Sequence, residues 1–517
     1  MAQIANEKLE VALEKASNLA INNIVQAKML SERHRNLLVK QGFLKPVIRG
    51  WYMLDADVTT TDAGKSALWF DSIWGFVGQY LTELFDEEYW LSPESSLDLL
   101  TSSNALPQQI IVYAKSTTRV LNLPHNMSLV VMNSTKSPYK IETVAGVKVA
   151  SVESVLASIS PSAYTRNPIS LQIALGLADI SELAGAFEHT RNASAVGRTL
   201  GALKTLEQEE DYLRLKRIVD GIGFVELDET NPFEQPVTKI GVSNNENPAA
   251  MRVRALWQSL RDDVEQVFSD IRPSFDFMSR PLEDTFKEME ELYVQDAYHS
   301  LSIEGYRVTP ALIEKVRDGN WHPELIEKDK EAKDALAARG YFEAFNAVKS
   351  SLKTIHEKKI GKLSSAISIG ITDWYTYLFQ PCVAAGLIAA KHIAGYRKGP
   401  VYIRTSRHAP PADIYLRDCM DALKMLIEDE PSYLVKAILG HLCLGYIHPF
   451  PDGNGRTARF LMNFLLTLGG YDWTIVKLED RADYLSSLEK ASIDHLGTPF
   501  AKFVLMSMQK TGVDKSK

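Results

Sequence analysis

The sequence predicts a mainly α-helical protein, and three observations support this fold class. Apolar residues recur at helical spacing from Met251 to Phe268. Two further runs, Tyr433 to Ile447 and Phe460 to Leu468, are apolar almost throughout, as core helices are. Alternating segments typical of strands are short and lie mainly in the N-terminal half. We therefore expect an all-helical C-terminal domain with one small β-hairpin, preceded by smaller domains that contain strands.

Length and composition are those of a soluble, multidomain chain. At 517 residues, several domains are expected. Hydrophobic residues make up 45% and charged residues 24%, which is ordinary for globular proteins. The net charge of −8 excludes a general attraction to nucleic acid, so any basic patch must be local.

The cysteines and the apolar stretches favour a reducing compartment. The three cysteines are far apart and odd in number, which argues against a disulfide framework or a zinc site. Residues 1–17 carry charges every few positions and lack the apolar core of a signal peptide. The longest apolar stretches, Pro381 to Ala390 and Ala437 to Ile447, are shorter than the roughly 20 residues that span a membrane. We therefore expect a cytoplasmic protein with no membrane partner. The cysteines are Cys382, Cys419 and Cys443.

Residues 1–60 are predicted to form a winged-helix domain. Residues 1–19 have the pattern of an amphipathic helix, and Ile24 to Leu30 reads as a short helix. Ser31 is a suitable N-cap for another helix from Glu32 to Lys40.

Phe43 to Leu54 follows as a predicted β-hairpin with its turn at Arg49-Gly50, and helices followed by a hairpin give the order of a winged helix. Between residues 31 and 52 there are five basic side chains and one acid, Glu32, which makes a local basic patch. The candidate DNA contacts are Arg33, Arg35, Lys40 and Arg49.

The stretch LLVKQGFLKPVIRGWYML, residues 37–54, resembles the start of AbiEi-type antitoxins, which bind DNA through a winged helix. The resemblance implies DNA as a partner. A winged helix used only for protein contacts or dimerisation fits the same residues, so both interpretations stay open.

Residues 61–226 are predicted to form a small α+β domain. Strand-like segments occur at Ile110 to Ala114, Ser128 to Met132 and Val147 to Val152, and helical patterns follow them. Residues 227–248 are rich in Pro, Asn and acids and have weak periodicity, which is typical of a linker.

Residues 249–517 are predicted to be a helical domain. Its helical patterns are Met251–Phe268, Leu282–Ser302, Asp334–Lys353, Thr372–Ile393, Ile414–Leu426, Tyr433–Ile447, Phe460–Leu468 and Asp480–Ser492.

Residues 448–459, HPFPDGNGRTAR, join two of these helices and can carry phosphate chemistry. Gly453 and Gly455 fall where the second helix begins, so unpaired backbone N–H groups and a close backbone approach make an anion site. Arg456 and Arg459 are three residues apart, so they share a helix face and can reach two phosphates.

The same loop offers a cation ligand and a base. Asp452 is a hard oxygen ligand suited to Mg²⁺ beside phosphates. His448 has an ordinary pKa near neutrality and suits general-base work. The alternative is a glycine-rich turn with surface arginines and a packed histidine.

The loop resembles the Fic family signature, H-x-F-x-[D/E]-G-N-G-R-x-x-R, at every fixed position. Fic proteins mostly transfer AMP from ATP to a Tyr, Thr or Ser hydroxyl of a protein, and some use other nucleotide donors. The resemblance covers roughly residues 250–505. It implies a Fic domain, ATP as the substrate and Mg²⁺ or Mn²⁺ as the metal. Relatives that phosphorylate depart from the GNGR core, which is intact here, so AMP transfer is favoured.

The resemblance also implies a role for each residue. His448 would take the hydroxyl proton, and Asp452 would hold the metal. Arg459 would grip the γ-phosphate, and Phe450 would plug the loop into the core. The residues implied to bind the phosphates are Gly453, Asn454, Gly455, Arg456 and Arg459.

Ser300 to Gly305, SLSIEG, resembles the Fic inhibitory motif, [S/T]-x-x-x-E-[G/N]. The resemblance implies that Glu304 pairs with Arg459 and occupies the place of the γ-phosphate, with Ser300 in the same motif. Some relatives also use this glutamate to align water and remove AMP. The alternative is an ordinary helix C-terminus.

Tyr396 to Pro411 breaks the helical pattern and resembles the Fic flap, a small hairpin that could align a target segment by strand addition. Its candidate docking residues are Val401, Tyr402, Ile403 and Arg404. His408 reads as a surface histidine, and the resemblance places Tyr484 near the nucleotide base.

The sequence thus predicts an autoinhibited protein adenylyltransferase whose protein target is unknown and could be the chain itself. The alternative is a DNA-binding regulator or antitoxin whose Fic half only senses nucleotide. His448 favours the enzyme, because a sensor would not need the base. Relatives of this class often dimerise through the helical half, which makes a homodimer a further expectation.

Overall fold

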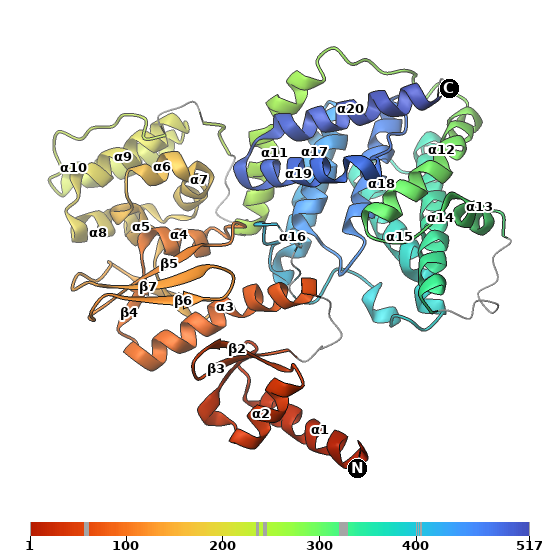
Figure 1. Ribbon diagram of the computed structural model, residues 1–517. Helices are drawn as coiled ribbons and strands as arrows, with labels where there is room; N and C mark the ends of the chain where they lie inside the picture. Colours follow the sequence, from red (N-terminus) through yellow and green to blue (C-terminus); the bar gives the residue numbers. More distant parts are fainter. Residues whose placement is uncertain are drawn as a thin grey trace. The chain divides into compact units, whose positions relative to one another are not determined.

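The structure is a computed structural model that describes residues 2–55, 62–233, 237–240, 246–319, 329–399, 401, 403 and 406–515 (Figure 1). The chain divides into two compact units. One contains Met1–Pro248 and Pro400–Ala409, and the other contains Ala249–Gly399 and Pro410–Lys517. Most of the described residues are helical, as the sequence predicts.

The first unit begins with a three-stranded sheet and two helices. The elements are α1 (Ala2–Leu19), β1 (Ile24–Gln26), α2 (Glu32–Lys40), β2 (Leu44–Ile48) and β3 (Trp51–Leu54), with a 3₁₀ turn, η1 (Ala27–Met29), after β1. The strand order is β1-β3-β2, and both pairings are antiparallel. The predicted α2 is confirmed, and Ser31 caps it by accepting a hydrogen bond from the His34 N–H at 3.3 Å.

The prediction of a helix from Ile24 to Leu30 is wrong for its first residues, because Ile24–Gln26 forms strand β1. Ile24 and Val25 are buried, and Ile24 pairs with Met53 of β3. Their β-branched side chains suit a strand better than a helix when a partner strand is present. Sequence periodicity could not find this strand, because its three residues are too few to show alternation.

The rest of the first unit combines small sheets with helices. A four-stranded sheet has the order β4-β5-β7-β6, with β5 and β7 parallel, and β8 and β9 form a hairpin. The predicted segment Val147–Val152 ends as a strand at Ala150, because Ser151 caps the next helix. The bounds are α3 (Asp62–Phe85), β4 (Tyr89–Leu91), α4 (Pro93–Leu100), β5 (Gln109–Ala114), β6 (Arg119–Leu123), β7 (Met127–Asn133), β8 (Ile141–Val144), β9 (Val147–Ala150), α5 (Val152–Ser158), α6 (Ser162–Arg166), α7 (Pro168–Leu177), α8 (Ile180–Thr190), α9 (Ala193–Thr205) and α10 (Glu209–Gly221).

The segment predicted as a linker is irregular, but its first residues are packed rather than free. A Cβ on Gly201 of α9 would lie 2.0 Å from the Thr230 carbonyl oxygen, so backbone touches backbone here. Phe233 is buried, and its ring packs edge-on against Tyr164. Residues 234–236 and 241–245 of the segment lie outside the described part.

The second unit is helical and has one continuous hydrophobic core. Its helices are α11 (Pro248–Val267), α12 (Leu282–Ile303), α13 (Pro310–Arg317), α14 (Asp329–His356), α15 (Leu363–Ala384), α16 (Leu416–Asp429), α17 (Tyr433–Ile447), α18 (Asn454–Leu468), α19 (Arg481–Asp494) and α20 (Gly497–Lys515), with 3₁₀ turns η3 (Ala390–His392), η4 (Asp413–Tyr415) and η5 (Leu478–Asp480). The helix predicted from Thr372 to Ile393 ends earlier, at Ala384. Helix α18 starts at Asn454, between the two glycines that the sequence predicts at the start of this helix.

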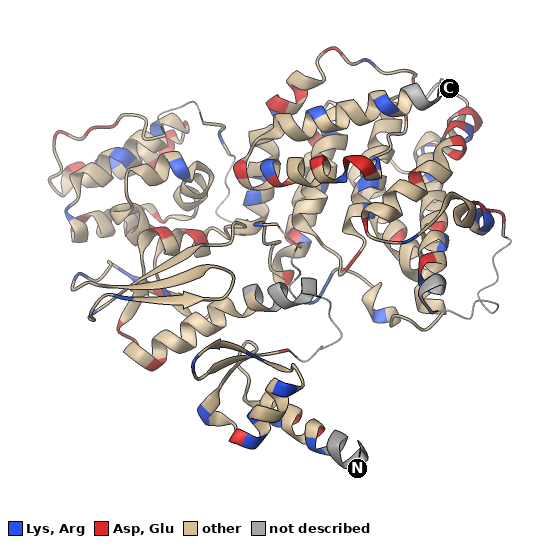
Figure 2. Cartoon of the chain, viewed as in Figure 1, with Lys and Arg blue, Asp and Glu red and all other residues tan. Residues whose placement is uncertain are grey.

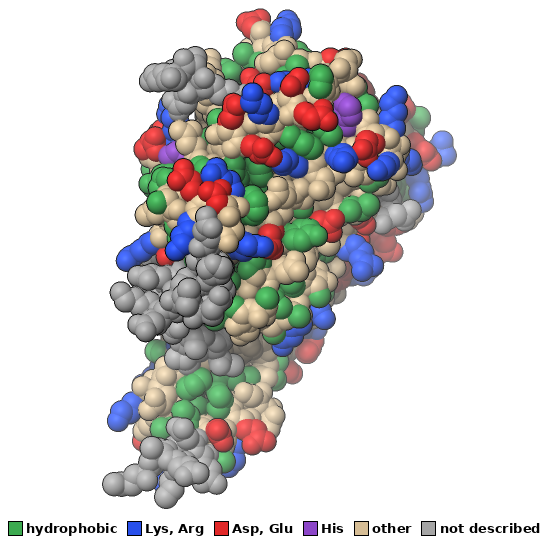
Figure 3. All heavy atoms as spheres, turned by 90° about the vertical axis from the view of Figure 1, so that its right-hand side faces the viewer, with side chains coloured by type: hydrophobic (Ala, Val, Ile, Leu, Met, Phe, Trp, Pro, Cys, Tyr) green, Lys and Arg blue, Asp and Glu red, His purple; other side chains and the backbone are tan. Residues whose placement is uncertain are grey.

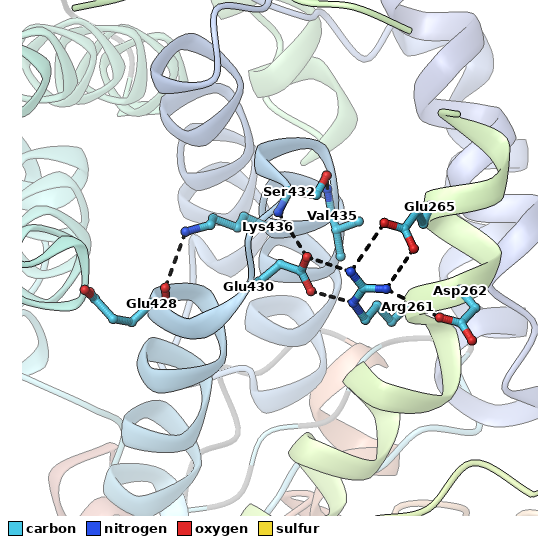
Figure 4. Close-up of polar contacts among 8 residues, drawn as sticks. All are labelled: Arg261, Asp262, Glu265, Glu428, Glu430, Ser432, Val435 and Lys436. Carbon is cyan, nitrogen blue, oxygen red and sulfur yellow. Dashed lines mark hydrogen bonds and ion pairs between the residues drawn. The ribbon is translucent and has the colours of Figure 1, made fainter. Parts of the chain in front are cut away.

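Helices α17 and α18 form the centre of this unit. Nearly every residue of both is buried, as expected for helices that are apolar on most sides. The start of α17 is fixed by an ion pair from α11, in which Arg261 Nε lies 2.8 Å from Glu430 Oε2 (Figure 4). Glu430 also accepts from the Ser432 N–H, and Ser432 caps α17.

The predicted flap does not form a hairpin in the part that the structure describes. Val401 and Ile403 are not in a strand, and Tyr402 and Arg404 lie outside the described residues. The end of the segment instead pairs with a loop of the first unit, where the Ala409 N–H donates to the Asn104 carbonyl at 2.7 Å. His408 bridges to Ala105 and is 2% exposed, so its prediction as a surface residue is wrong.

No single described helix is long and apolar enough to cross a membrane, although the sharply bent pair Pro168–Leu177 and Ile180–Thr190 passes that test jointly. Charged side chains of both signs are interspersed with apolar ones on the face drawn in Figure 3.

Candidate active site

His448 ends helix α17 in a left-handed conformation, with φ 51° and ψ 58°. Buried Arg397 braces the turn that follows: its Nε donates to the His448 carbonyl and its N–H to the Pro449 carbonyl, both at 2.9 Å. Sequence reasoning missed Arg397, because a single arginine in an irregular segment gives no pattern.

The environment of the His448 ring keeps it neutral. Its Nδ1 lies 3.2 Å from the Gly445 carbonyl oxygen. Burial lowers the pKa of His448 to about 4. A neutral ring bonded to a carbonyl must carry its proton on Nδ1, which leaves the Nε2 lone pair available as a base.

The loop after His448 is held by packing and by its own side chains. The Phe450 ring stacks on Tyr375 of α15 with 3.8 Å between centroids and 9° between planes, so its predicted role as a plug is confirmed. The Asn454 side chain accepts from the Phe450 N–H at 2.9 Å and donates to its carbonyl at 2.8 Å. The Asn454 side chain is therefore used by the loop itself, and only its backbone N–H is left for an anion.

Helix α18 begins without a side-chain cap, at Gly453 in the left-handed region with φ 76°. Its first N–H groups are therefore not satisfied by a cap, and the helix start favours an anion. A Cβ on Gly453 would lie 2.7 Å from the Phe379 ring of α15, so only glycine fits.

Arg456 is buried, at 1% exposure, and is held mainly by aromatic rings. Its guanidinium lies 5.1 Å from the Tyr306 ring centroid and 5.0 Å from that of Phe379. Its Nε has no hydrogen-bond partner, and its Nη2 lies 3.5 Å from Asp452 Oδ2. The Asp452 side chain is 64% exposed, which leaves this carboxylate accessible.

Arg459 joins α18 to the end of α12. Its Nε donates to Ser300 Oγ at 2.9 Å, and its Nη2 lies 2.8 Å from Glu304 Oε1. Burial raises the pKa of the Glu304 carboxyl, but the charges of Arg459 and Arg456 outweigh burial and hold that pKa below its ordinary value. Glu304 is therefore an ionised partner of Arg459.

Glu304 also covers the start of α18. A Cβ on Gly455 would lie 2.4 Å from Glu304 Oε1, so the carboxylate rests directly on the first turn of that helix. The place that suits an anion is occupied by the protein's own anion, while Arg459 Nη1 remains without a partner.

Comparison with known proteins agrees with this geometry. The Fic/DOC family matches residues 371–466, which run from within α15 into α18 and include the whole loop. Residues 371–466 are therefore similar to the Fic/DOC family.

Curated relatives of the Fic domain are named protein adenylyltransferase Fic. The relative from Nematostella vectensis is 30% identical over 271 residues, covering 52% of this chain and 58% of the relative. The relative from Culex quinquefasciatus is 27% identical over 235 residues, covering 43% of this chain and 41% of the relative. The chain therefore spans less than two thirds of the length of either. A solved structure of C. elegans Fic-1 (aa134 – 508) aligns with a TM-score of 0.36 and 17% identity, covering 67% of this chain and 88% of that one.

Behind the Fic loop lies a buried polar cluster that the sequence did not reveal. Asp296, one turn before Ser300 on α12, is 3% exposed and accepts a hydrogen bond from the Tyr341 hydroxyl at 2.7 Å. Burial raises its pKa to about 6, and the Arg459 charge opposes that shift. Spacing along α12 could have suggested it, because positions 296, 300 and 304 share one helix face.

The predicted place of Tyr484 near the nucleotide base stays a prediction. The side chain is 3% exposed, and its hydroxyl lies 2.8 Å from His441 Nε2. The ring packs against Phe503 of α20. Tyr484 is a core residue of the helical unit, because α19 turns this face inward.

Asp452 is the candidate ligand for a metal ion. No group of three or more His, Cys, Asp or Glu side chains that could hold a metal occurs among the described residues. A site for Mg²⁺ beside phosphates needs only one or two protein carboxylates. The exposed Asp452, next to partly unpartnered arginine nitrogens, fits that kind of site.

Proposed function

We propose that the protein transfers AMP from ATP to a Tyr, Thr or Ser hydroxyl of a protein. The observation that carries this proposal is the meeting of three features in one turn. They are a neutral histidine, an uncapped helix start, and two buried guanidinium groups with unpartnered nitrogen atoms. Glu304 and Asp452 leave nitrogen atoms of both buried guanidinium groups without hydrogen-bond partners, and such groups are costly to bury, so the site favours a polyanionic ligand. The name of the curated relatives supports ATP as that ligand.

In the proposed reaction, each group of the site has one role. Nε2 of His448 accepts the proton of the target hydroxyl, and the hydroxyl oxygen bonds to the α-phosphorus of ATP. The bond from that phosphorus to the α,β-bridging oxygen breaks, and pyrophosphate leaves with the electron pair. Arg456, Arg459 and the start of α18 stabilise the negative charge. Asp452 would hold Mg²⁺ or Mn²⁺, which neutralises phosphate charge when bound.

In the same proposal, Glu304 is an inhibitory side chain. It pairs with Arg459 and covers Gly455, so a triphosphate must displace it to reach both. Two anions cannot share one guanidinium edge without repulsion. Removal of AMP by a water that Glu304 aligns stays a prediction.

Transfer from ATP labelled with ³²P tests the type of reaction. Glu304→Gly protein is incubated with Mg²⁺ and either α-labelled or γ-labelled ATP, and incorporation into the protein itself or into added proteins is measured. The proposal expects label from the α-position only. Label from the γ-position would mean phosphorylation, and label from neither would favour a nucleotide sensor or another donor.

We also propose a DNA-binding function for residues 1–60, as a winged helix. Arg33 and Lys40 are exposed on α2, and Arg49 is exposed at the turn between β2 and β3. Basic positions of the chain are coloured blue in Figure 2. Arg35 is a weaker candidate, because its Nη1 lies 3.5 Å from the Ala27 carbonyl and the side chain is half-buried. A protein target, a homodimer and a cytoplasmic location stay predictions.

A further inference from the structure

Arg456 is held in a different way from Arg459. Arg459 binds the protein through its nitrogen edge, whereas the guanidinium of Arg456 lies against two aromatic rings, Tyr306 and Phe379. A guanidinium is planar and weakly hydrated, so its faces can lie on rings while its N–H edge stays open. The Asp452 carboxylate lies 3.5 Å from Nη2 and leaves both Nη2 and Nε without a hydrogen-bond partner, so the edge that a phosphate needs is not filled.

Phe379 supports the glycine-rich loop as well as Arg456. The same ring lies against Gly453, where an added Cβ would approach to 2.7 Å. Four residues earlier on α15, Tyr375 stacks on Phe450. Positions four apart share a helix face, so α15 supports both the loop and the arginine from one surface.

Tyr306 links this support to the inhibitory glutamate. It lies two residues after Glu304, with Gly305 between them at φ 90°. The segment that places a carboxylate on Arg459 therefore also places a ring on Arg456. The carboxylate on Arg459 opposes the binding of a triphosphate, whereas the ring on Arg456 supports it.

We propose that Tyr306 and Phe379 are positioning residues that hold Arg456 by its faces for a phosphate group. This inference rests on the proposed function.

Binding of Mg²⁺-ATP by calorimetry tests this without turnover. The parent protein is the full chain with Glu304→Gly and His448→Ala, which lacks the inhibitory carboxylate and the base. Adding Tyr306→Leu or Phe379→Leu is expected to raise the Kd about tenfold, since an aromatic face contributes of the order of a kcal/mol to holding a buried cation. Tyr306→Phe keeps the ring and is expected to stay within about twofold of the parent.

Two controls separate positioning from folding. Tyr377→Leu removes an exposed ring from α15, two positions from Phe379, and is expected to leave the Kd unchanged. Thermal unfolding of each variant shows whether the fold persists. If Phe379→Leu does not fold, Tyr306→Leu tests the same contact at a half-buried loop position.

Transfer measurements then test the positioning role of Tyr306 during turnover. In the Glu304→Gly background with His448 intact, Tyr306→Leu is expected to raise the KM for ATP about tenfold with little change in kcat, because Arg456 binds both ground state and transition state. Equal Kd in the folded Leu variants and the parent would overturn the positioning role. Tight ATP binding without any AMP transfer would overturn the proposed function and leave the positioning role intact, whereas no ATP binding by the parent would overturn both.

Discussion

His448 is placed between the Gly445 carbonyl and a backbone braced by Arg397, and burial governs its proton. The spacing of the loop identified it as the base, but the sequence could not show that its pKa falls to about 4. A histidine with an ordinary pKa would be partly charged at neutral pH, whereas this one is ready to accept a proton well below it.

This low pKa predicts the pH profile of transfer by Glu304→Gly protein at saturating ATP. The rate should change less than about twofold between pH 8 and pH 5.5 and should be half lost only near pH 4. Loss of half of the rate near pH 6.5 would instead show that the ring titrates as it does in solvent.

The same low pKa predicts how stability depends on pH. The pKa of His448 in the folded protein lies below its value in the unfolded chain, so protonation favours the unfolded chain. The contribution of His448 should therefore lower the free energy of unfolding increasingly as the pH falls from 6.5 to about 4.

Asp452 leads to a prediction about the metal. Because its exposed carboxylate is the proposed ligand, Asp452→Asn in the Glu304→Gly background should lower kcat roughly a hundredfold and raise the Mg²⁺ concentration needed for half-maximal rate. A Mg²⁺ titration of transfer measures both. Unchanged Mg²⁺ dependence would remove Asp452 from the metal site, and exposed Asp262→Asn serves as the matched control.

At the scale of elements, sequence periodicity located long helices well and short or interrupted elements poorly. Helix α17 occurs where its apolar run predicts. The three-residue strand β1 depends on its partner strand β3, and this pairing is not visible in local periodicity. Contacts between distant segments, such as Tyr306 on Arg456, leave no local pattern at all.

The pair between Arg261 and Glu430 predicts how α11 stabilises the start of α17. The Glu430 side chain is 3% exposed, so Arg261→Ala would leave a buried carboxylate without its cation. The free energy of unfolding of the helical unit should fall by about 2–3 kcal/mol in urea. Asp262→Ala, at a neighbouring side chain that is 96% exposed, should change it by less than about 0.5 kcal/mol. Equal stability of the two variants would contradict the structural role of the pair.

At the scale of the whole molecule, the proposed catalytic residues and the proposed inhibitory glutamate belong to one compact unit, while the proposed DNA-binding residues belong to the other. From the sequence, a change from mixed to purely helical patterns predicts a linker at residues 227–248. The sequence also predicted the composition of the site, because the loop and the inhibitory segment are contiguous motifs. The arrangement of Arg397, Asp296 and Phe379 around them could not be predicted, since each is brought in by a different helix or loop.

The DNA-binding proposal leads to a prediction about salt. Arg33→Ala with Lys40→Ala should weaken binding to double-stranded DNA and reduce the slope of log K against log salt by about 1.8, if each contacts one phosphate. Titrations at several salt concentrations measure that slope. Lys353→Ala with Lys359→Ala, which removes two exposed charges from the helical unit, is the control. Salt-independent binding or no binding would favour a winged helix used for protein contacts.

The most direct test of AMP transfer restrained by Glu304 is the intact mass of three proteins after incubation with Mg²⁺ and ATP. They are the wild type, Glu304→Gly, and Glu304→Gly with His448→Ala. The account predicts added AMP on Glu304→Gly and little or none on the other two, because one retains the inhibitor and the other lacks the base. Equal AMP on the wild type would contradict inhibition by Glu304, and equal AMP on the double variant would contradict His448 as the base.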